Sequence, residues 1–445
     1  MTSSALPVVV IGAGPIGLAA AAELVVREQD VIVLERGERA ADAVRQWGHV
    51  RLFSPWSEVT SPAAVALLEA AGWEHPDRAA YPTGAEWSRD YLEPLAQLLG
   101  ERVRTSSQVI GVARLDRDLL VDSGRDEQPF VLHVSSPGGT HDRVLARAVI
   151  DCSGTWSSPN PLGAEGYPAA GEDAATGQVL HGMPDPVRDL TRFQGASTAV
   201  VGSGASALTA LIALTSAPLH TADSRVVWVV RRGAVGSAFG GGELDELPAR
   251  GALGTRVRTA VQEGLIEVVT GFRVSAVERH GRQVALWAAD GRHMDGLDQV
   301  VGATGFRPDL TFLSEVRLDL DARLQAPTAL APGIDPNLHS CGSVQPHGFE
   351  VLAQPERELF LAGMKSYGRA PSFLAMTGHE QVRSIAAALA GDLVAARAVE
   401  LQLPDTGVCG GAGLFDEEPG AGGGCCGTDP GPQPLTLTAP AGVAR

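Results

Sequence analysis

Residues 8–17 have the sequence Val8-Val9-Val10-Ile11-Gly12-Ala13-Gly14-Pro15-Ile16-Gly17. The four β-branched residues at its start are typical of a buried strand in a parallel sheet. Residues 16–26 are rich in alanine and leucine, as expected of a helix packed on such a sheet, and Pro15 suits the first helical turn because its missing N–H costs little there. Residues 31–34 form a second apolar run. The stretch therefore predicts a strand, turn, helix and strand at the start of an α/β domain.

The turn between the first strand and the helix, residues 12–17, has the spacing GxGxxG. The first glycine of this pattern permits a tight turn, the second lets the backbone approach a pyrophosphate, and the third allows close packing of helix and strand. Amide groups at the helix N-terminus favour the phosphates. Glu35 ends the second strand, where a carboxylate accepts hydrogen bonds from ribose hydroxyls and disfavours a 2′-phosphate. The unit predicts a site for FAD or NAD; an ordinary glycine-rich turn is the alternative.

A second unit of this kind starts at residue 198, and its turn is Gly202-Ser203-Gly204-Ala205-Ser206-Ala207, with the spacing GxGxxA. Alanine in the last position still allows close packing. The next strand, predicted at residues 225–230, is followed by Arg231 and Arg232 instead of an acid. Guanidinium groups can pair with a 2′-phosphate through charge-assisted hydrogen bonds. The second site is therefore predicted to bind NADPH, which assigns FAD to the first. A solvated strand end is the alternative explanation of the two arginines.

The two units predict a discontinuous FAD domain into which an NADPH domain is inserted, each a Rossmann-like α/β domain of three layers. We place the first part of the FAD domain at residues 1–165, the NADPH domain at 166–303 and the second part of the FAD domain at 304–403. Residues 404–445 are rich in glycine, proline and cysteine and lack apolar periodicity, which predicts a flexible tail. Outside the two units, we expect strands at residues 102–113, 130–135 and 144–151, and helices at residues 86–99 and 378–390.

The composition narrows the classes of partner and compartment. The chain of 445 residues carries a net charge of −17, which disfavours nucleic acid and anionic membrane surfaces as partners. The apolar stretch from residue 8 to 26 is interrupted by glycines, Pro15 and Glu23 and has no basic n-region, so we expect neither a membrane span nor a signal peptide. Five cysteines, two of them adjacent, do not suit a disulfide framework. We expect a cytoplasmic protein with a small-molecule substrate and leave its oligomeric state open.

Three further motifs carry a resemblance. Asp151-Cys152-Ser153-Gly154-Thr155-Trp156, followed by Pro159-Asn160-Pro161, resembles the exit from the FAD domain in flavin-containing monooxygenases and Baeyer–Villiger enzymes. Ala303-Thr304-Gly305-Phe306-Arg307-Pro308 resembles their ATG motif, and Leu361-Ala362-Gly363-Met364-Lys365-Ser366 lies where such proteins bring a last loop to the flavin. Together with the two glycine-rich turns, these motifs make residues 6–400 similar to the two-dinucleotide-binding flavoprotein superfamily and, within it, to flavin-containing monooxygenases.

The resemblance also implies which residues contact the cofactors. The segment from Trp47 to Trp56 resembles flavin monooxygenases that travel with arsenic-resistance operons, in which the fold is joined to a cysteine-bearing tail. Its aromatic residues and Arg51 would line the flavin, and a packing loop is the alternative. The predicted cofactor-binding residues are Gly12, Ala13, Gly14, Pro15, Ile16, Gly17, Glu35, Arg36, Arg51, Val109, Gly154, Gly202, Ser203, Gly204, Ala205, Ser206, Arg231, Arg232, Thr304, Gly305 and Gly363.

The cysteines bear on the reaction. Disulfide reductases of this superfamily carry a redox cysteine pair soon after the first ribose acid or in the nicotinamide domain, whereas Cys152 is the only cysteine here before Cys341. In the tail, Cys409, Cys425 and Cys426 offer soft thiolates that suit a trivalent metalloid. We expect these three to capture a metalloid or another soft substrate; a redox relay and a tail without function are the alternatives.

These observations predict an NADPH- and FAD-dependent monooxygenase that inserts one oxygen atom of O₂ into a soft nucleophilic substrate, a trivalent organoarsenical being favoured. The first alternative is an FAD-dependent reductase that relays electrons through the tail cysteines to a metal(loid) or a disulfide. The second is a non-catalytic metalloid-binding flavoprotein. The sequence assigns no catalytic acid or base.

Overall fold

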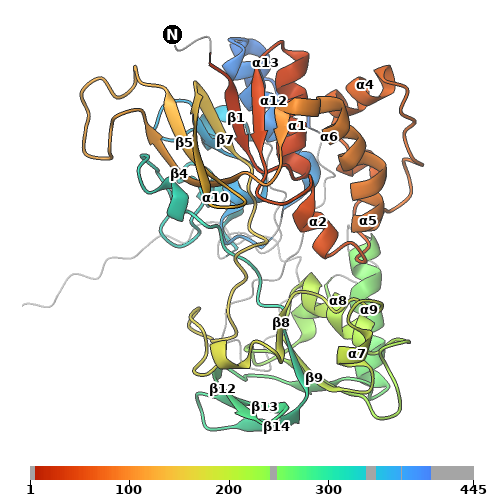
Figure 1. Cartoon of the computed structure of the whole chain (residues 1–445). Coiled ribbons are helices and arrows are strands. Elements are labelled where there is room, and N and C mark those ends of the chain that lie inside the picture. Colours follow the sequence, from red (N-terminus) through yellow and green to blue (C-terminus); the bar gives the residue numbers. More distant parts are fainter. Residues whose placement is uncertain (1–5, 241–247, 337–346, 372, 402–445) are drawn as a thin grey trace, which may run out of the picture.

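Two α/β units make up the computed structural model, which describes residues 6–240, 248–336, 347–371 and 373–401. In Figure 1 the unit that contains both ends of the described chain lies above the second unit, and two linkers join them. The lower unit lies in the sequence between β7 (Ala148–Asp151) and β16 (Leu359–Leu361), which are neighbouring strands of the upper unit. The predicted fold class, an α/β domain with a second one inserted into it, is confirmed. The predicted soft-metal ligands lie outside the described residues: Cys409, Cys425 and Cys426.

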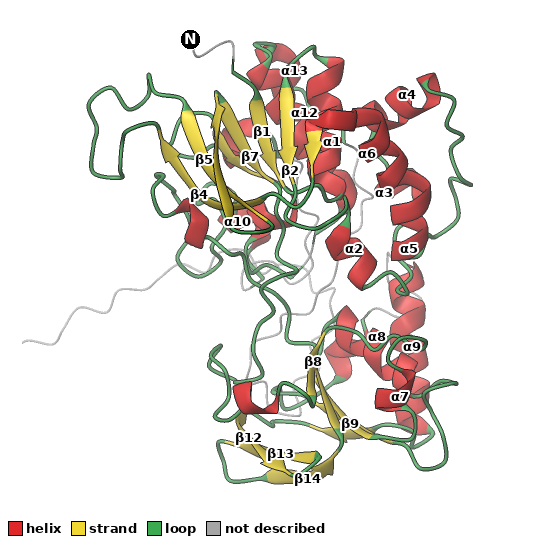
Figure 2. Cartoon of the chain, in the orientation of Figure 1, coloured by secondary structure: helices red, strands yellow, loops and turns green. Residues whose placement is uncertain are grey.

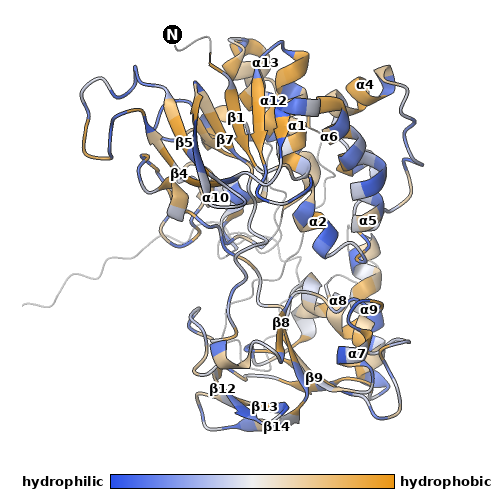
Figure 3. Ribbon diagram, viewed as in Figure 1, coloured by the Kyte–Doolittle hydropathy of each residue, from blue (hydrophilic) through white to orange (hydrophobic). Residues whose placement is uncertain are grey.

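The upper unit is built on a parallel sheet of five strands. In spatial order these are β16, β7, β1 (Val8–Ile11), β2 (Val31–Leu34) and β3 (Val103–Arg104). The register pairs Ile11 with Leu34 on one side and with Asp151 on the other, so these three strands end at the same edge of the sheet. Figure 3 shows β1, β7 and α1 (Pro15–Val26) as strongly hydrophobic, which agrees with their burial.

Each face of this sheet is covered by a different kind of layer, as Figure 2 shows. α1 and α12 (Ala375–Leu389) pack on one face, where they contact the side chains of Val8 and Val10. Val9 and Ile11 point to the opposite face and belong to a second core cluster. That face is covered by an antiparallel sheet of three strands, namely β4 (Gln108–Arg114), β5 (Phe130–Ser136) and β6 (Thr140–Ala146). Burial on both faces explains why all four residues of β1 are apolar.

Two predicted strands are wrong in extent because each joins residues of two different sheets. The stretch predicted at residues 102–113 contains β3, in the parallel sheet, and β4, in the antiparallel sheet, with Ser106 between them at a φ of 50°. The stretch predicted at residues 144–151 likewise divides at Arg147 into β6 and β7. Apolar periodicity does not report the sheet to which a strand belongs, so the sequence did not reveal these breaks.

The helix predicted at residues 86–99 is present and begins slightly earlier. The Glu86 amide donates to the Thr83 hydroxyl and the Thr83 amide donates to the Glu86 carboxylate, which makes a capping box. The helical run then continues through α5 (Gly84–Trp87), a π-helical turn (Ser88–Leu92) and α6 (Glu93–Leu99). The helix predicted at residues 378–390 is α12.

The lower unit repeats the architecture of the upper one. Its parallel sheet has the spatial order β11 (Glu267–Val269), β10 (Arg225–Val229), β9 (Ser197–Val201), β15 (Gln299–Gly302) and β8 (Val179–His181). One face is covered by α8 (Ala205–Leu214) and α9 (Pro248–Gln262). The other is covered by antiparallel strands, namely β12 (Val274–His280), β13 (Gln283–Ala288) and β14 (His293–Leu297). None of the helices in the described ranges is long and apolar enough to cross a membrane.

Candidate cofactor and substrate site

The two glycine-rich turns face one cavity. This central cavity, of about 1190 Å³, lies between the two units and is lined by residues of both, together with the two linkers. Gly12 and Gly14 of the upper unit and Gly202 and Gly204 of the lower unit are among its lining residues. Each turn follows the central strand of its sheet, β1 or β9, so the carboxyl ends of both parallel sheets open on the same space.

In the upper turn, two of the three glycines are required by the protein's own backbone. Gly12 has a φ of +96°, and a Cβ there would lie 3.0 Å from the Cys152 carbonyl oxygen. A Cβ on Gly17 would lie 1.9 Å from the Gly12 carbonyl oxygen, so the third glycine lets α1 approach the turn. Gly14 is different, because its φ is −79° and no atom lies within 4 Å of the position of a Cβ. The open space at Gly14, at the N-terminus of α1, fits a phosphate group.

The lower turn has the same division of roles. Gly202 has a φ of +138°, and a Cβ there would lie 2.1 Å from the Ala303 carbonyl oxygen. Gly204 has a φ of −86° and open space where a Cβ would point. The third position is Ala207, which is fully buried against the core of the lower unit. Its turn therefore also fits a phosphate group at a helix N-terminus, in this case that of α8.

The strand ends beside the two turns carry opposite charge. Glu35 follows β2, and its carboxylate accepts hydrogen bonds from the amides of Ala13 (2.7 Å) and Gly37 (2.8 Å). Arg231 and Arg232 follow β10 at the corresponding edge of the lower sheet. All three charged side chains line the central cavity. Burial and the neighbouring Arg232 guanidinium lower the pKa of Arg231, a combination that an anion placed between the two arginines would relieve.

Most of the other predicted cofactor-binding residues also line the central cavity. The upper unit and the linkers contribute Pro15, Ile16, Arg36, Gly154, Thr304, Gly305 and Gly363. The lower unit contributes Ser203, Ala205 and Ser206. Gly363 has a φ of +69°, and a Cβ there would lie 3.1 Å from the Ile16 side chain, so the loop after β16 sits directly on the first turn of α1.

Four predicted residues are not among the lining residues. Two of them, Ala13 and Gly17, belong to the upper turn itself, where the Ala13 amide donates to Glu35 and Gly17 packs on the Gly12 carbonyl. The other two lie elsewhere. The side chain of Arg51 is exposed and donates to the Tyr81 carbonyl, because Arg51 pairs with Thr83 in an isolated bridge that turns its side chain outward. Val109 lies on β4 with its side chain in the core of the upper unit, opposite Val134. Neither lines the cavity.

The aromatic segment that contains Arg51 does reach the central cavity through other side chains. Trp47, Leu52, Phe53 and Ser54 line it. Trp56, at the end of the segment, is instead buried in the core of the upper unit. Only part of the segment is therefore a packing loop, and the rest of it forms a wall of the cavity.

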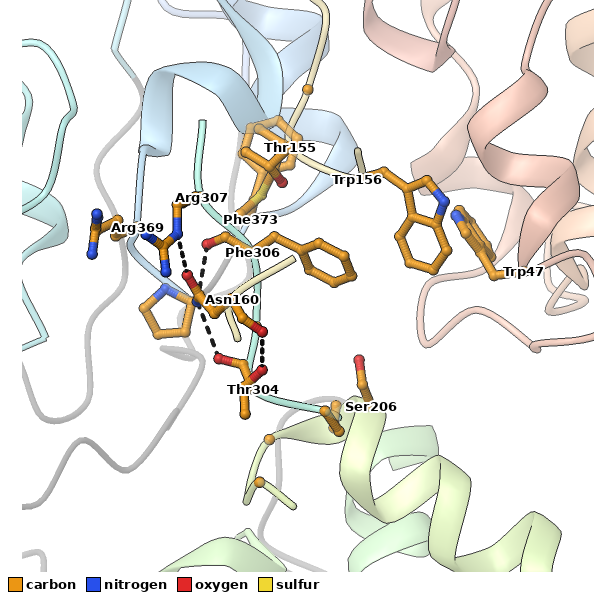
Figure 4. A pocket seen from close by; sticks show the side chains of 18 of the residues that line it. Trp47, Thr155, Trp156, Asn160, Ser206, Thr304, Phe306, Arg307, Arg369 and Phe373 are labelled. Atoms are coloured by element: carbon orange, nitrogen blue, oxygen red, sulfur yellow. Dashed lines mark hydrogen bonds between the residues drawn. The ribbon is translucent and has the colours of Figure 1, made fainter. Parts of the chain in front are cut away.

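The two linkers are held together by Asn160, which the sequence did not single out as a site residue. The side-chain nitrogen of Asn160 donates to the backbone carbonyl of Thr304 (3.1 Å), and the backbone carbonyl of Asn160 accepts a hydrogen bond from the Thr304 hydroxyl (2.5 Å). The Arg307 Nε donates to Asn160 Oδ1 at 2.8 Å. Figure 4 shows these bonds in the cavity, with the rings of Trp156 and Phe306 nearby and their centroids 4.9 Å apart. The sequence signal was the Pro-Asn-Pro stretch, whose proline rings fix the backbone on both sides of Asn160.

A buried lysine fixes the loop that follows β16. Lys365 is fully buried, and its Nζ lies 3.2 Å from Asp151 Oδ2 and 3.0 Å from Ser153 Oγ. It also donates to the carbonyl of Asp309 on the returning linker. Removing either partner of such a pair would leave a buried charge without compensation. Lys365 thus ties the end of β7, the returning linker and the Gly363 loop together at the edge of the sheet.

Cys152 is the one cysteine among the described residues. It lines the cavity at the end of β7. Burial, together with the neighbouring Asp151 carboxylate, raises the pKa of the Cys152 thiol well above its usual range. A neutral thiol is a poor nucleophile. The described part of the chain therefore holds no redox cysteine pair beside the glycine-rich turns.

Comparison with known proteins identifies the family. The sequence pattern of the pyridine nucleotide-disulphide oxidoreductase family matches residues 9–329, which is most of the chain. The chain belongs to this family. As a pyridine nucleotide-disulphide oxidoreductase family member, the protein is an FAD-dependent oxidoreductase that uses NADPH, and both turns fit these cofactors. Family membership sets aside the hypothesis of a non-catalytic metalloid-binding protein.

Solved structures share the fold. The bacillithiol disulfide reductase Bdr (YpdA) from Bacillus cereus is 18% identical, with a TM-score of 0.65 over 87% of this chain and 99% of its own. A flavin monooxygenase from Stenotrophomonas maltophilia is 22% identical, with a TM-score of 0.54 over 87% of this chain and 98% of its own. The ornithine hydroxylase PvdA from Pseudomonas aeruginosa is 16% identical, with a TM-score of 0.56 over 87% and 99%. No curated protein matches the sequence.

Proposed function

We propose that this protein is an NADPH- and FAD-dependent monooxygenase that inserts one oxygen atom of O₂ into a soft nucleophilic small molecule, with a trivalent organoarsenical as the favoured substrate. The observation that supports this most is the shared cavity, on which both glycine-rich turns open and in which Cys152 is a single, neutral thiol. FAD, when bound, carries electrons from NADPH to an acceptor that can be O₂. The described residues beside the turns hold no cysteine pair, so this part of the chain offers no disulfide that would relay those electrons.

The residues of the chain would hold the substrate and keep water out. Trp47, Trp156, Phe306 and Phe373 present aromatic surfaces to the cavity. No histidine occurs among its described lining residues, so none of them offers an imidazole for proton transfer. A soft atom such as trivalent arsenic or divalent sulfur already carries the electron pair that attacks oxygen, and it needs no base to expose it. This fits a site that has aromatic walls and no histidine among its described lining residues.

The arsenical substrate is supported by features of the sequence. The segment from Trp47 to Trp56 resembles monooxygenases of arsenic-resistance operons, and part of it lines the cavity. Cys409, Cys425 and Cys426 offer three thiols, the ligand set that a trivalent arsenic centre prefers. In this proposal the thiols capture the arsenical and deliver it to the cavity.

Oxygen consumption tests the proposal. The purified, FAD-loaded protein is mixed with NADPH in air and under anaerobic conditions, with and without phenylarsenous acid or a thioether. The proposal expects oxygen uptake that depends on the substrate, with one atom from ¹⁸O₂ in the product and one NADPH oxidised per product. Oxygen uptake that forms only hydrogen peroxide, at a rate independent of added substrate, would contradict it.

A disulfide or metalloid reductase is the second candidate. It is favoured by the similarity in fold to Bdr, whose name states that it reduces a disulfide. In this alternative the tail cysteines relay electrons from FAD to a disulfide or to a metal(loid). It predicts NADPH oxidation without oxygen when a low-molecular-weight disulfide or an oxidised metalloid is added, and the anaerobic arm of the same experiment measures that rate.

A further inference from the structure

The charges that line the central cavity are not those of the whole chain. The chain has a net charge of −17. Among the described lining residues, however, arginines outnumber acids by six to three, counted from the two sets that follow. The arginines are Arg36, Arg231, Arg232, Arg250, Arg307 and Arg369, and the acids are Glu35, Asp42 and Glu165. Among the described residues, this excess of positive side chains favours anionic ligands.

Two of the six arginines belong to neither glycine-rich turn. Arg36 follows the upper turn's strand, while Arg231, Arg232 and Arg250 lie in the lower unit. Arg307 is on the linker that returns to the upper unit, and Arg369 is on the loop between Tyr367 and α12. Figure 4 shows the Arg307 and Arg369 side chains next to each other, on the Asn160 side of the pocket and away from Trp47. The nucleotide turns therefore do not account for this pair.

The acceptors that hold these two arginines are all neutral. Arg307 donates from Nε to Asn160 Oδ1 and from Nη2 to the Gly166 carbonyl, both at 2.8 Å. Arg369 donates from Nε to Gln325 Oε1 at 2.7 Å. Within the described part of the chain, no carboxylate lies within ion-pair distance of either arginine. Burial and the nearby Arg369 lower the pKa of Arg307, so the two like charges are close enough to repel one another.

We propose that Arg307 and Arg369 form a subsite for a carboxylate carried by the substrate, beside the aromatic surface of Trp156 and Phe306. The neutral acceptors hold the guanidinium of half-buried Arg307 in place, while exposed Arg369 sits at the rim where a ligand enters. A carboxylate would accept hydrogen bonds from both and remove their mutual repulsion. Phe306 is adjacent to Arg307, so an aromatic body could stack while its acid group reaches the arginines.

That the ligand is a substrate rests on the proposed monooxygenase function. It narrows the substrate to a soft nucleophile, sulfur or arsenic, on an aromatic or apolar body that also bears an acid group. An uncharged thioether or arsenical of the same shape would bind more weakly.

Equilibrium binding tests the subsite without turnover. Calorimetry would compare 4-(methylthio)benzoate with 4-(methylthio)benzamide, which have the same shape and differ in charge, on the oxidised FAD-loaded enzyme in the absence of NADPH. We expect the carboxylate to bind about tenfold or more tightly than the amide, with an advantage that shrinks as salt is raised. Arg369→Gln should remove most of this advantage, because it removes one of the two guanidinium groups that would bind the carboxylate. The linkers should stay joined, because Arg369 bonds to Gln325 and takes no part in the hydrogen bonds of Asn160.

Two further variants control the measurement. Arg307→Lys keeps the positive charge but loses the paired N–H donors of the guanidinium group. It should lower the carboxylate affinity by less than Arg369→Gln does. Arg282→Gln, in the turn between β12 and β13, removes an exposed arginine that is not among the cavity's lining residues, and it should leave both probe affinities unchanged. Equal affinity for the two probes would overturn the proposal. It would also be overturned if Arg369→Gln weakened NADP⁺ binding and left the probe affinities unchanged, because the pair would then serve the nucleotide. Intact discrimination without any oxygenated product would contradict the proposed function alone.

Discussion

The two glycine-rich turns have a similar backbone and differ in the charged residues at the end of the neighbouring strand. In each, the first glycine has a positive φ, and a Cβ there would be too close to a backbone carbonyl oxygen at the start of a linker. That oxygen belongs to Cys152 for Gly12 and to Ala303 for Gly202. In each, the second glycine, Gly14 or Gly204, has an ordinary φ and open space around it. The backbone of the protein thus requires a glycine at the first position, whereas no contact within the described residues requires one at the second. We propose that a cofactor phosphate occupies this space.

The third position and the strand ends separate the two sites. Gly17 has no room for a Cβ, while the lower unit accommodates the methyl group of Ala207. Glu35 is locked by two backbone amides beside the upper turn, and arginines occupy the corresponding place below. We therefore propose that a similar backbone takes either nucleotide and that the charge at the strand end selects between them.

The largest effect is expected at Gly14. In Gly14→Val, the side chain fills the space that the pyrophosphate needs, so FAD content should fall from about one per chain to below about a tenth. The protein should remain folded, because a φ of −79° suits any residue. Flavin absorbance per chain measures the outcome. Gly177→Val is the matched control, since Gly177 also has open space around it but lies outside the cavity lining. Full flavin content in Gly14→Val would mean that FAD does not bind at this turn.

Gly204→Val should break the other half of the comparison. The valine blocks the phosphate space at the N-terminus of α8, so the KM for NADPH should rise about tenfold or more while the FAD content stays unchanged. Steady-state kinetics and the flavin spectrum of the same sample measure both quantities. Loss of flavin together with NADPH would show that the two turns are not independent sites.

A smaller effect is expected from the strand-end arginines. Each charge-assisted hydrogen bond to a 2′-phosphate is worth about 1.5–3 kcal/mol. Arg231→Ala or Arg232→Ala should therefore narrow the preference for NADPH over NADH by about tenfold, through NADPH alone. The ratio of kcat/KM for the two cofactors measures this preference. Arg225→Ala, at the opposite end of β10 where Arg225 pairs with Glu267, should leave the ratio unchanged. Equal use of both cofactors by the unaltered protein would refute the assignment.

The smallest effect on either turn is expected from removing the tail. The described residues that line the cavity end at Ala375, so truncation after Leu403 should leave FAD content and anaerobic flavin reduction by NADPH unchanged. The KM for trivalent arsenicals should rise, and Cys425→Ser combined with Cys426→Ser should reproduce that rise. A fall of kcat at saturating substrate would instead support electron relay through the thiols. If neither KM nor kcat moves, the tail has no part in this chemistry.

The candidate site was predictable where chemistry depends on local backbone. Glycine spacing and strand ends can be recognised from consecutive residues. The sequence therefore predicted residues of both turns, together with Glu35, Arg231, Arg232 and Gly363, and the structure places them in the lining of the cavity. Arg51 was not predictable in this way, since its direction is set by a bridge to Thr83, more than thirty positions further on. The same limit applies to Asn160, Arg307 and Arg369, which become a group only when the linkers meet.

By itself, the sequence determined that the chain contains two strand–turn–helix units and that its cofactors are FAD and NADPH. Those properties follow from hydrophobic period, glycine spacing and the charge of single residues, all of which act over a few neighbours. Only the tertiary structure decided that both turns open on one cavity and that the predicted strands at residues 102–113 and 144–151 divide between sheets. It also placed Lys365 against Asp151 and left two arginines without a carboxylate partner among the described residues. These features depend on contacts between residues far apart in the sequence, 44 positions for Arg369 with Gln325 and 212 for Lys365 with Ser153, which sequence periodicity does not encode.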